Sequence, residues 1–254
     1  MSTAPKTVLK ALSLLDVVAR NPNLTLSELG RKEGVPAPTA LRLLRALQEA
    51  SLVQVDGEGR YRLGIQCLVL GSTYLEGFDL RAEARIELER LAEETGETVH
   101  LGVPDGTEVI YVDKVETSHS VRMYSRVGAA SPMYSTGIGK AILAHASPAL
   151  FDAVAEAGLV RRTPNTIIEP ARLREELKRV REQGFAVDDI ENEDGIRCAA
   201  AAVLRADGTP LAAVSVSGPS SRITEDRVAA LGEAVVAVAD RLSARLGYPH
   251  KENA

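Results

Sequence analysis

The sequence predicts an α+β protein of two parts, a short helical segment that ends in a hairpin and a longer segment of mixed strands and helices. Three observations predict this class. Apolar residues recur with helical spacing as far as residue 50, glycine and acidic residues interrupt residues 52–63, and alternating and helical patterns follow one another from residue 79 onward. With 254 residues, of which 45% are hydrophobic, the chain is long enough for two domains with cores of their own.

Residues 1–64 form the first predicted domain, with three helices followed by a hairpin. The expected elements are helices at Thr7–Arg20, Leu26–Glu33 and Pro38–Ala50, then strands at Leu52–Val55 and Arg60–Leu63. Gly34 supplies the turn between the second and third helices, and Pro36 prevents the second helix from continuing. Two short helices across a tight turn, with a glycine-rich hairpin after them, are typical of a winged helix-turn-helix. This pattern favours a protein that binds duplex DNA.

The third helix has an apolar face and a polar face. Leu41, Leu44 and Leu47 centre on the apolar side, and Arg42 lies opposite. An arginine there can contact guanine edges or phosphates, and the pattern does not decide between them. The alternative is an ordinary solvated amphipathic helix. The residues predicted to contact DNA are Thr25, Ser27, Lys32, Thr39, Arg42, Arg45, Arg60 and Arg62.

Charge is divided unevenly along the chain. The net charge is −5, but residues 1–62 hold nine Lys or Arg against six Asp or Glu, a charge of +3, which leaves −8 for the remainder. A basic end on an acidic body suits a protein that contacts phosphate with one end. No apolar run approaches the ~20 residues of a membrane span, and Met1–Lys10 lacks the apolar stretch of a signal peptide, so we expect a cytoplasmic protein with no membrane partner.

A connecting helix is expected within residues 65–78, at about Ile65–Glu76, and a second domain within residues 79–250. In the second domain the expected helices are Asp79–Thr95, Gly139–Ala146, Pro148–Ala157, Pro170–Gln183 and Thr224–Leu246, and the expected strands are Thr98–Val103, Glu108–Val115, Ser120–Val127, Phe185–Asp188, Cys198–Leu204 and Leu211–Ser217. This mixture indicates an α+β domain with helices on the faces of a sheet.

Three stretches carry a resemblance to a known family. They are TALRLLRAL at residues 39–47, SPMYSTGIGKAILA at 131–144 and EDGIRCAAAAVLRADGTPLAAVSVSGPSSRIT at 193–224. In these the chain resembles the IclR family of bacterial transcriptional regulators, from Lys6 to about Tyr248. The resemblance implies a winged helix-turn-helix, a linker helix and a C-terminal GAF-like effector-binding domain, acting as a homodimer or homotetramer on double-stranded, palindromic operator DNA. It does not distinguish a repressor from an activator.

Two positions depart from the family pattern. Pro38-Thr39 stands where Ser-Thr often opens the recognition helix, so a hydroxyl contact to phosphate from the first of these positions is lost. Ala202 stands where proline is common after the sequence Cys-Ala-Ala, and we attach no functional weight to this change.

The resemblance also implies a pocket for a small organic anion. The matched residues are Gly137, Ile138, Asp188, Cys198, Ser215 and Ser217, with Met123, Ser131 and Ile196 as further wall positions. Amides at the start of the helix that carries Lys140 suit a carboxylate, with Gly137 and Gly139 allowing its approach, and Ser215 and Ser217 point to one face of a strand. Ser131 replaces a possible leucine, which favours a hydroxylated ligand. We therefore expect a carboxylate effector, a sugar acid or its keto-deoxy derivative, that controls a catabolic operon.

The sequence also leaves room for other classes of protein. A thiol-dependent enzyme on a GAF-like domain would use Cys198, although no cysteine or base lies near it in sequence and Cys67 belongs to the connecting helix. A dimerisation scaffold would leave the paired serines and the glycine turn without a role. GIGK lacks two residues of a nucleotide phosphate loop, and His100 and His119 lack acid and nucleophile partners in sequence. We expect no catalytic residue, metal or cofactor, and a regulator rather than an enzyme.

Overall fold

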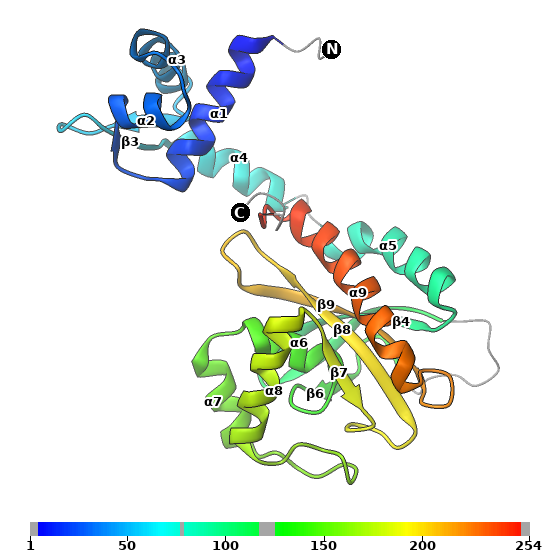
Figure 1. The fold of residues 1–254 in the computed structure, drawn as a ribbon. Coiled ribbons are helices and arrows are strands. Elements are labelled where there is room, and N and C mark those ends of the chain that lie inside the picture. The colour runs from blue at the N-terminus through cyan, green and yellow to red at the C-terminus, as the bar shows by residue number, and fades with distance from the viewer. Residues whose placement is uncertain (1–4, 77–78, 117–124, 250–254) are drawn as a thin grey trace. The chain divides into compact units, whose positions relative to one another are not determined.

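The structure is a computed structural model that describes residues 5–76, 79–116 and 125–249. Contacts divide the chain into two compact units, Met1–Phe78 and Asp79–Ala254. Each unit has its own buried core. Figure 1 shows the helices and strands of each.

The first unit packs helices around a small antiparallel sheet. Its elements are α1 (Lys6–Arg20), β1 (Leu24–Thr25), α2 (Leu26–Lys32), α3 (Ala37–Glu49), β2 (Val53–Val55), β3 (Arg60–Leu63) and α4 (Ile65–Glu76). The strands lie in the order β1-β3-β2, so that β2 and β3 form the wing. Leu14, Leu29 and Leu44 are fully buried at the centre of the core. The predicted winged helix-turn-helix is confirmed.

Local signals set the turn between α2 and α3. Glu28 Oε2 accepts hydrogen bonds from the backbone N of Thr25 at 2.8 Å and from its hydroxyl at 2.7 Å, which fixes the start of α2. Gly34 adopts φ +65°, a conformation that favours glycine, and Pro36 stands just before α3. The buried face of α3 comprises Ala40, Leu43, Leu44 and Leu47, whereas the predicted Leu41 is half-buried at its edge.

The second unit is a six-stranded antiparallel sheet with helices on both faces (Figure 1). Its elements are α5 (Leu80–Thr95), β4 (Thr98–Asp105), β5 (Glu108–Val115), β6 (Ala130–Pro132), α6 (Gly137–His145), α7 (Pro148–Ala157), α8 (Pro170–Gln183), β7 (Ala186–Asp189), β8 (Ile196–Leu204), β9 (Pro210–Pro219) and α9 (Glu225–Arg245). The strand order is β6-β5-β4-β9-β8-β7. Helices α5 and α9 cover one face and α6 to α8 the other, each over a separate apolar cluster.

Two expected elements differ from the structure. The predicted strand Ser120–Val127 lies mostly outside the described residues, and its described part, residues 125–127, is not a strand. The edge strand is instead β6, whose three residues are too few to show an alternating pattern. Helix α6 begins two residues before the predicted start, because the Thr136 hydroxyl accepts a hydrogen bond from Gly139 N at 3.1 Å and so caps it.

Within the described part of the chain, no helix is both long and apolar enough to span a membrane.

Candidate functional site

The outer side of α3 presents two arginines to solvent. Arg42 and Arg45 are exposed, and neither has an ion pair within residues 5–76. They line a surface hollow together with Pro38 and Ala46. Both guanidinium groups are therefore free to contact phosphates or base edges, and their contact with DNA stays a prediction.

The other residues predicted to contact DNA fall into two groups. Ser27, Lys32 and Arg62 are exposed. The rest are partly committed to the protein itself: the Thr25 hydroxyl donates to Glu28, Thr39 is half-buried in the first turn of α3, and Arg60 donates from Nη1 to the Asn23 carbonyl at 3.1 Å and pairs with Glu58 at 3.2 Å.

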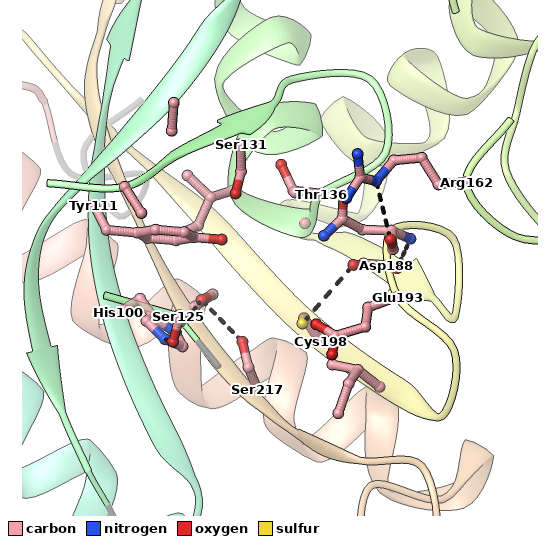
Figure 2. A pocket seen from close by; sticks show the side chains of 17 residues that line it. His100, Tyr111, Ser125, Ser131, Thr136, Arg162, Asp188, Glu193, Cys198 and Ser217 are labelled. Carbon is pink, nitrogen blue, oxygen red and sulfur yellow. Dashed lines mark hydrogen bonds between the residues drawn. The ribbon is translucent and has the colours of Figure 1, made fainter. Parts of the chain in front are cut away.

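The second unit contains a cavity of about 310 Å³ between the sheet and the start of α6 (Figure 2). The predicted effector residues that line it are Ser131, Gly137, Ile138, Asp188, Ile196, Cys198, Ser215 and Ser217. The remaining predicted residue, Met123, lies outside the described residues. Figure 2 shows the cavity walls running from Tyr111 and His100 at one end to Asp188 and Arg162 at the other.

Strand register brings these residues together from distant parts of the sequence. Asp188 of β7 pairs with Cys198 of β8, and Cys198 pairs with Ser217 of β9. Two residues along β9, Ser215 pairs with His100 of β4. Alternate residues of a strand, and residues paired directly across neighbouring strands, point to the same face of a sheet. The acid, the thiol, the serines and the histidine therefore line one polar floor of the cavity.

Helix α6 supplies two uncommitted amides. Gly139 N donates to the Thr136 hydroxyl and Lys140 N to the Thr136 carbonyl at 2.9 Å. The amides of Gly137 and Ile138 make no hydrogen bond within the described residues, and both residues line the cavity. Free N–H groups at a helix start attract an anion through hydrogen bonds and the helix dipole.

Asp188 is the most perturbed acid on the wall. It is 2% exposed, and burial raises its pKa to about 7 against the opposing effect of the Lys140 charge. Its Oδ1 accepts hydrogen bonds from the backbone amides of Glu191 at 2.7 Å and Asn192 at 3.2 Å. Near neutral pH a substantial share of Asp188 is protonated, so its other oxygen can donate to a ligand oxygen.

Cys198 lies next to this acid, with Sγ 4.0 Å from Asp188 Oδ2. Burial and the neighbouring Asp188 raise the pKa of the thiol above its ordinary value. A nucleophilic or redox-active cysteine requires a depressed pKa, so this environment disfavours the thiol-enzyme alternative.

His100 lies on β4 and lines the cavity, although the sequence analysis did not include it among the effector-binding residues. Its Nε2 lies 2.6 Å from the Ser125 hydroxyl, its Nδ1 3.5 Å from the Ser215 hydroxyl, and its ring is tilted against Tyr111 with 5.0 Å between centroids. Burial and the Lys114 charge lower its pKa to about 3, so it stays neutral and serves as a hydrogen-bonding group. His119 lies outside the described residues.

Several further wall residues were not predicted. They are Tyr111, Ser125, Ala129, Ala130, Thr136, Arg162, Asn192 and Glu193. Burial raises the pKa of Tyr111 to about 12, which keeps its hydroxyl protonated. Arg162 is exposed at the cavity rim, where its Nε donates to the Asn192 carbonyl at 3.0 Å. Alternation along β4 and β5 could have indicated His100 and Tyr111, whereas Arg162 and Asn192 lie on loops without a periodic signal.

Gly139 differs from the sequence-based expectation that it lets a ligand approach, and the neighbouring Lys140 also points elsewhere. Gly139 faces away from the ligand space, because an added Cβ would lie 2.3 Å from backbone atoms of Met133. Lys140 does not line the cavity either. Its Nζ is fully buried, and it forms ion pairs with Glu191 and, at 3.6 Å, with Glu176. Among the described residues, no cluster of His, Cys, Asp and Glu could hold a metal ion.

Comparisons with known proteins agree with this architecture. The family model described as "Bacterial transcriptional regulator IclR C-terminal" matches residues 72–244, and "IclR helix-turn-helix domain" matches residues 7–57. Over 257 residues the chain is 36% identical to the "Transcriptional repressor IclR" of Escherichia coli strain K12, covering 97% of this chain and 94% of the relative. It is 34% identical over 256 residues to the "Acetate operon repressor" of Salmonella typhimurium strain LT2, covering 97% and 93%.

Solved structures give the same answer. A crystal structure of an IclR transcriptional regulator from Silicibacter sp. TM1040 matches with a TM-score of 0.85 at 32% identity, and covers 96% of each chain. This one solved structure matches both units, over nearly the whole length of the chain. The chain belongs to the IclR family of DNA-binding bacterial transcriptional regulators.

Proposed function

We propose that this protein controls a catabolic operon by binding operator DNA through α3 and the β2–β3 wing, and that a small carboxylate binding in the cavity changes this affinity. The observation that carries the effector site is the pair of uncommitted amides at Gly137 and Ile138, which open onto the same cavity as the Ser215 and Ser217 hydroxyls. Such amides suit a carboxylate, and paired hydroxyls suit an adjacent hydroxyl or keto oxygen.

The polarity and size of the cavity favour a sugar acid. Hydroxyl groups from Tyr111, Ser125, Ser131 and Thr136 line it in addition to the β9 serines. At ~30 Å³ for each water, a volume of 310 Å³ corresponds to about ten waters. A hydroxylated acid of five or six carbons can use this space and these donors, whereas a two-carbon acid would leave most of them to water. A relative named for the acetate operon supports a role in carbon catabolism.

The DNA-binding role requires two recognition helices. We propose a homodimer or homotetramer in which two copies of α3 reach successive major grooves, about 34 Å apart. Arg42 and Arg45 would contact base edges or phosphates, while Ser27, Thr39 and Arg62 would contact the backbone. Thr25 and Arg60 would support the helix start and the wing, since their side chains already bond within the unit.

Fluorescence anisotropy of the full-length protein tests the DNA-binding function. The probe is the DNA upstream of its own gene, compared with an unrelated duplex at two salt concentrations. Selective binding that weakens with salt would support the proposal, because phosphate contacts release counterions. Equal affinity for both duplexes, unchanged by any acid in the panel below, would contradict it.

A thermal-shift panel tests the effector class. The panel holds galactonate, 2-keto-3-deoxygluconate, pyruvate and 4-hydroxybenzoate. A ligand at 100 times its Kd stabilises the folded state by ~2.7 kcal/mol, which the method detects. We expect the two sugar acids to stabilise the protein most; stabilisation by 4-hydroxybenzoate alone would exclude a sugar-acid effector.

A thiol enzyme remains a distinct candidate that one measurement can exclude. Cys198 is buried with a raised pKa, so we expect iodoacetamide to label it only after unfolding. Rapid labelling of Cys198 in the folded protein would revive the enzyme.

A further inference from the structure

A buried charged cluster lies behind the cavity wall, outside the pocket itself. Lys140 of α6 has no exposed surface, and its ammonium pairs with Glu191 and with Glu176 of α8. Glu191 is also buried, and its second oxygen, Oε2, has no hydrogen-bond partner among the described residues. The negative charge of Glu191 therefore depends on Lys140, because an unpaired buried carboxylate is strongly unfavourable.

Glu191 belongs to a turn that carries two wall residues. The turn spans residues 189–192, between Asp188 and Glu193, and Asp188 and Asn192 both line the cavity. Within it, Ile190 has φ +58°, in the left-handed region. A β-branched residue avoids this region because its Cβ substituents crowd the backbone. Surrounding contacts must therefore hold the turn in place.

A neighbouring loop bonds to every carbonyl of this turn. Asn165 Nδ2 donates to Asp189 O at 3.0 Å, and the Thr163 hydroxyl donates to Ile190 O at 2.6 Å. The Thr166 hydroxyl donates to Glu191 O at 2.7 Å, and Arg162 Nε to Asn192 O at 3.0 Å. Two ion pairs also reach the turn: Arg197 Nε pairs with Asp189 Oδ1 at 2.7 Å, and Lys140 pairs with the buried Glu191.

We propose that Lys140 is a positioning residue for the effector site: through Glu191 it holds the 189–192 turn in the conformation that places Asp188 and Asn192 on the cavity wall. The role of these two wall residues rests on the proposed function, whereas the hold on the turn does not. Without the ammonium, Glu191 must leave its buried position or become protonated. The turn then loses its one contact to a buried charge, and Ile190 can relax to an ordinary negative φ, which redirects the Asp188 carboxyl.

The strained residue supplies a specific test of this role. Glycine adopts a left-handed φ without steric cost, so Ile190→Gly should keep the turn in place when Lys140 is removed. A purely structural role in packing α6 against α8 would not be restored by a change in the turn. Rescue by Ile190→Gly therefore separates positioning from general stability.

The experiment is native-state hydrogen exchange on the full-length protein without ligand. It follows peptides that contain the amides of Glu191 and Asn192, which donate to Asp188 Oδ1. In Lys140→Met we expect exchange of these amides to rise on the order of tenfold, as is typical of a lost network contact. In Lys140→Met/Ile190→Gly we expect it to return most of the way. Amides of Val214 and Val216 in the central strand report global unfolding and should not change.

Ile142→Ala serves as the matched control, since Ile142 is fully buried on the same helix in an apolar cluster that includes none of residues 189–192. It should lower thermal stability without exposing the Glu191 amide. If Lys140→Met does not fold, Thr166→Val, which removes the hydroxyl donated to Glu191 O, takes its place, with the same rescue expected. Unchanged exchange in the folded variants, or a double variant no better than the single one, would overturn the proposal.

Affinity for galactonate then links the turn to the effector site. We expect it to fall on the order of tenfold in Lys140→Met and to recover in the double variant. Failure of the wild-type protein to bind any acid in the thermal-shift panel would count against the proposed function and leave the exchange result standing. Normal affinity in a variant with an exposed turn would separate Lys140 from ligand binding and overturn its positioning role.

Discussion

The two units place their candidate binding side chains in opposite environments. On α3, Arg42 and Arg45 are exposed cations with no ion pair in the described part of the unit. Around the cavity of the second unit, Asp188, His100 and Ser215 are each 2% exposed and bonded to one another or to backbone amides. An exposed side chain can be replaced without disturbing its neighbours. A side chain in a buried polar site cannot, because its position depends on the strands that pair around it. Substitutions should therefore affect binding alone in the first unit, and both folding and binding in the second.

The largest contrast is expected between two glycines. At Gly139 an added Cβ would lie 2.3 Å from Met133 backbone atoms, so Gly139→Ala must displace the start of α6. We expect a loss of ~3 kcal/mol in the free energy of unfolding, at the upper end for overpacking. Gly57→Ala at the wing tip is the control, since nothing lies within 4 Å of its added Cβ. Urea denaturation of both variants checks this, and equal stability would show that α6 tolerates the displacement.

The next effect concerns DNA affinity. Arg42→Ala should weaken operator binding by about 1–3 kcal/mol if the guanidinium contacts a base, and leave thermal stability unchanged because Arg42 is exposed and unpaired within its described unit. Arg172→Ala removes another exposed arginine, from the second unit, and should leave affinity unchanged. Anisotropy titrations measure both. Equal affinity for wild type and Arg42→Ala would remove this residue from the interface.

The sequence predicted the first unit more completely than the second for a physical reason. Its helices follow from leucine spacing, and its turn from Gly34 and Pro36, which are local signals. In the cavity, the two-residue spacing of Ser215 and Ser217 also predicted locally that they share a strand face. Asp188 and Cys198 were predicted from the family resemblance. Alternation along β4 could have indicated the face of His100, but its position beside Ser215 depends on pairing between residues 115 apart in sequence, which no local pattern shows.

The loops of the site could not be predicted at all. Arg162 and Asn192 meet through a side-chain bond to a backbone carbonyl, and such contacts leave no periodic trace in the sequence. The left-handed Ile190 contradicts local preference outright, and only its tertiary contacts explain it. Local sequence patterns therefore do not predict the loops that form part of the cavity wall.

A smaller effect is expected from pH on effector affinity. The folded-state pKa of Asp188 is raised to about 7, so the folded protein retains a proton there that the unfolded chain loses near pH 4. The stability that this proton contributes is present at low pH and is lost as pH rises toward 7. If the protonated acid donates to the ligand, galactonate affinity should fall up to tenfold for each pH unit above about 7.

Asp188→Asn keeps a donor on this wall without a titrating group. Calorimetric titrations with galactonate from pH 6 to 9 should show a declining affinity for the wild-type protein and a nearly flat profile for Asp188→Asn. A parallel decline in both proteins would assign the pH dependence to another group.

The smallest effects should separate the two wing arginines. Arg62 is exposed beside the buried Tyr61, and its side chain forms no hydrogen bond or ion pair within residues 5–76, so Arg62→Ala should weaken binding to operator and unrelated DNA alike and reduce the salt slope by about one. Arg60 already bonds to Asn23 O and Glu58, which ties the wing to the segment before β1. Arg60→Ala should therefore change the wing's hydrogen exchange more than the salt slope. A larger change in the salt slope than in the wing's hydrogen exchange would mean that Arg60 exchanges its internal partners for phosphate on DNA. DNA binding by the first unit would then depend on breaking contacts within the protein, as well as on its exposed cations.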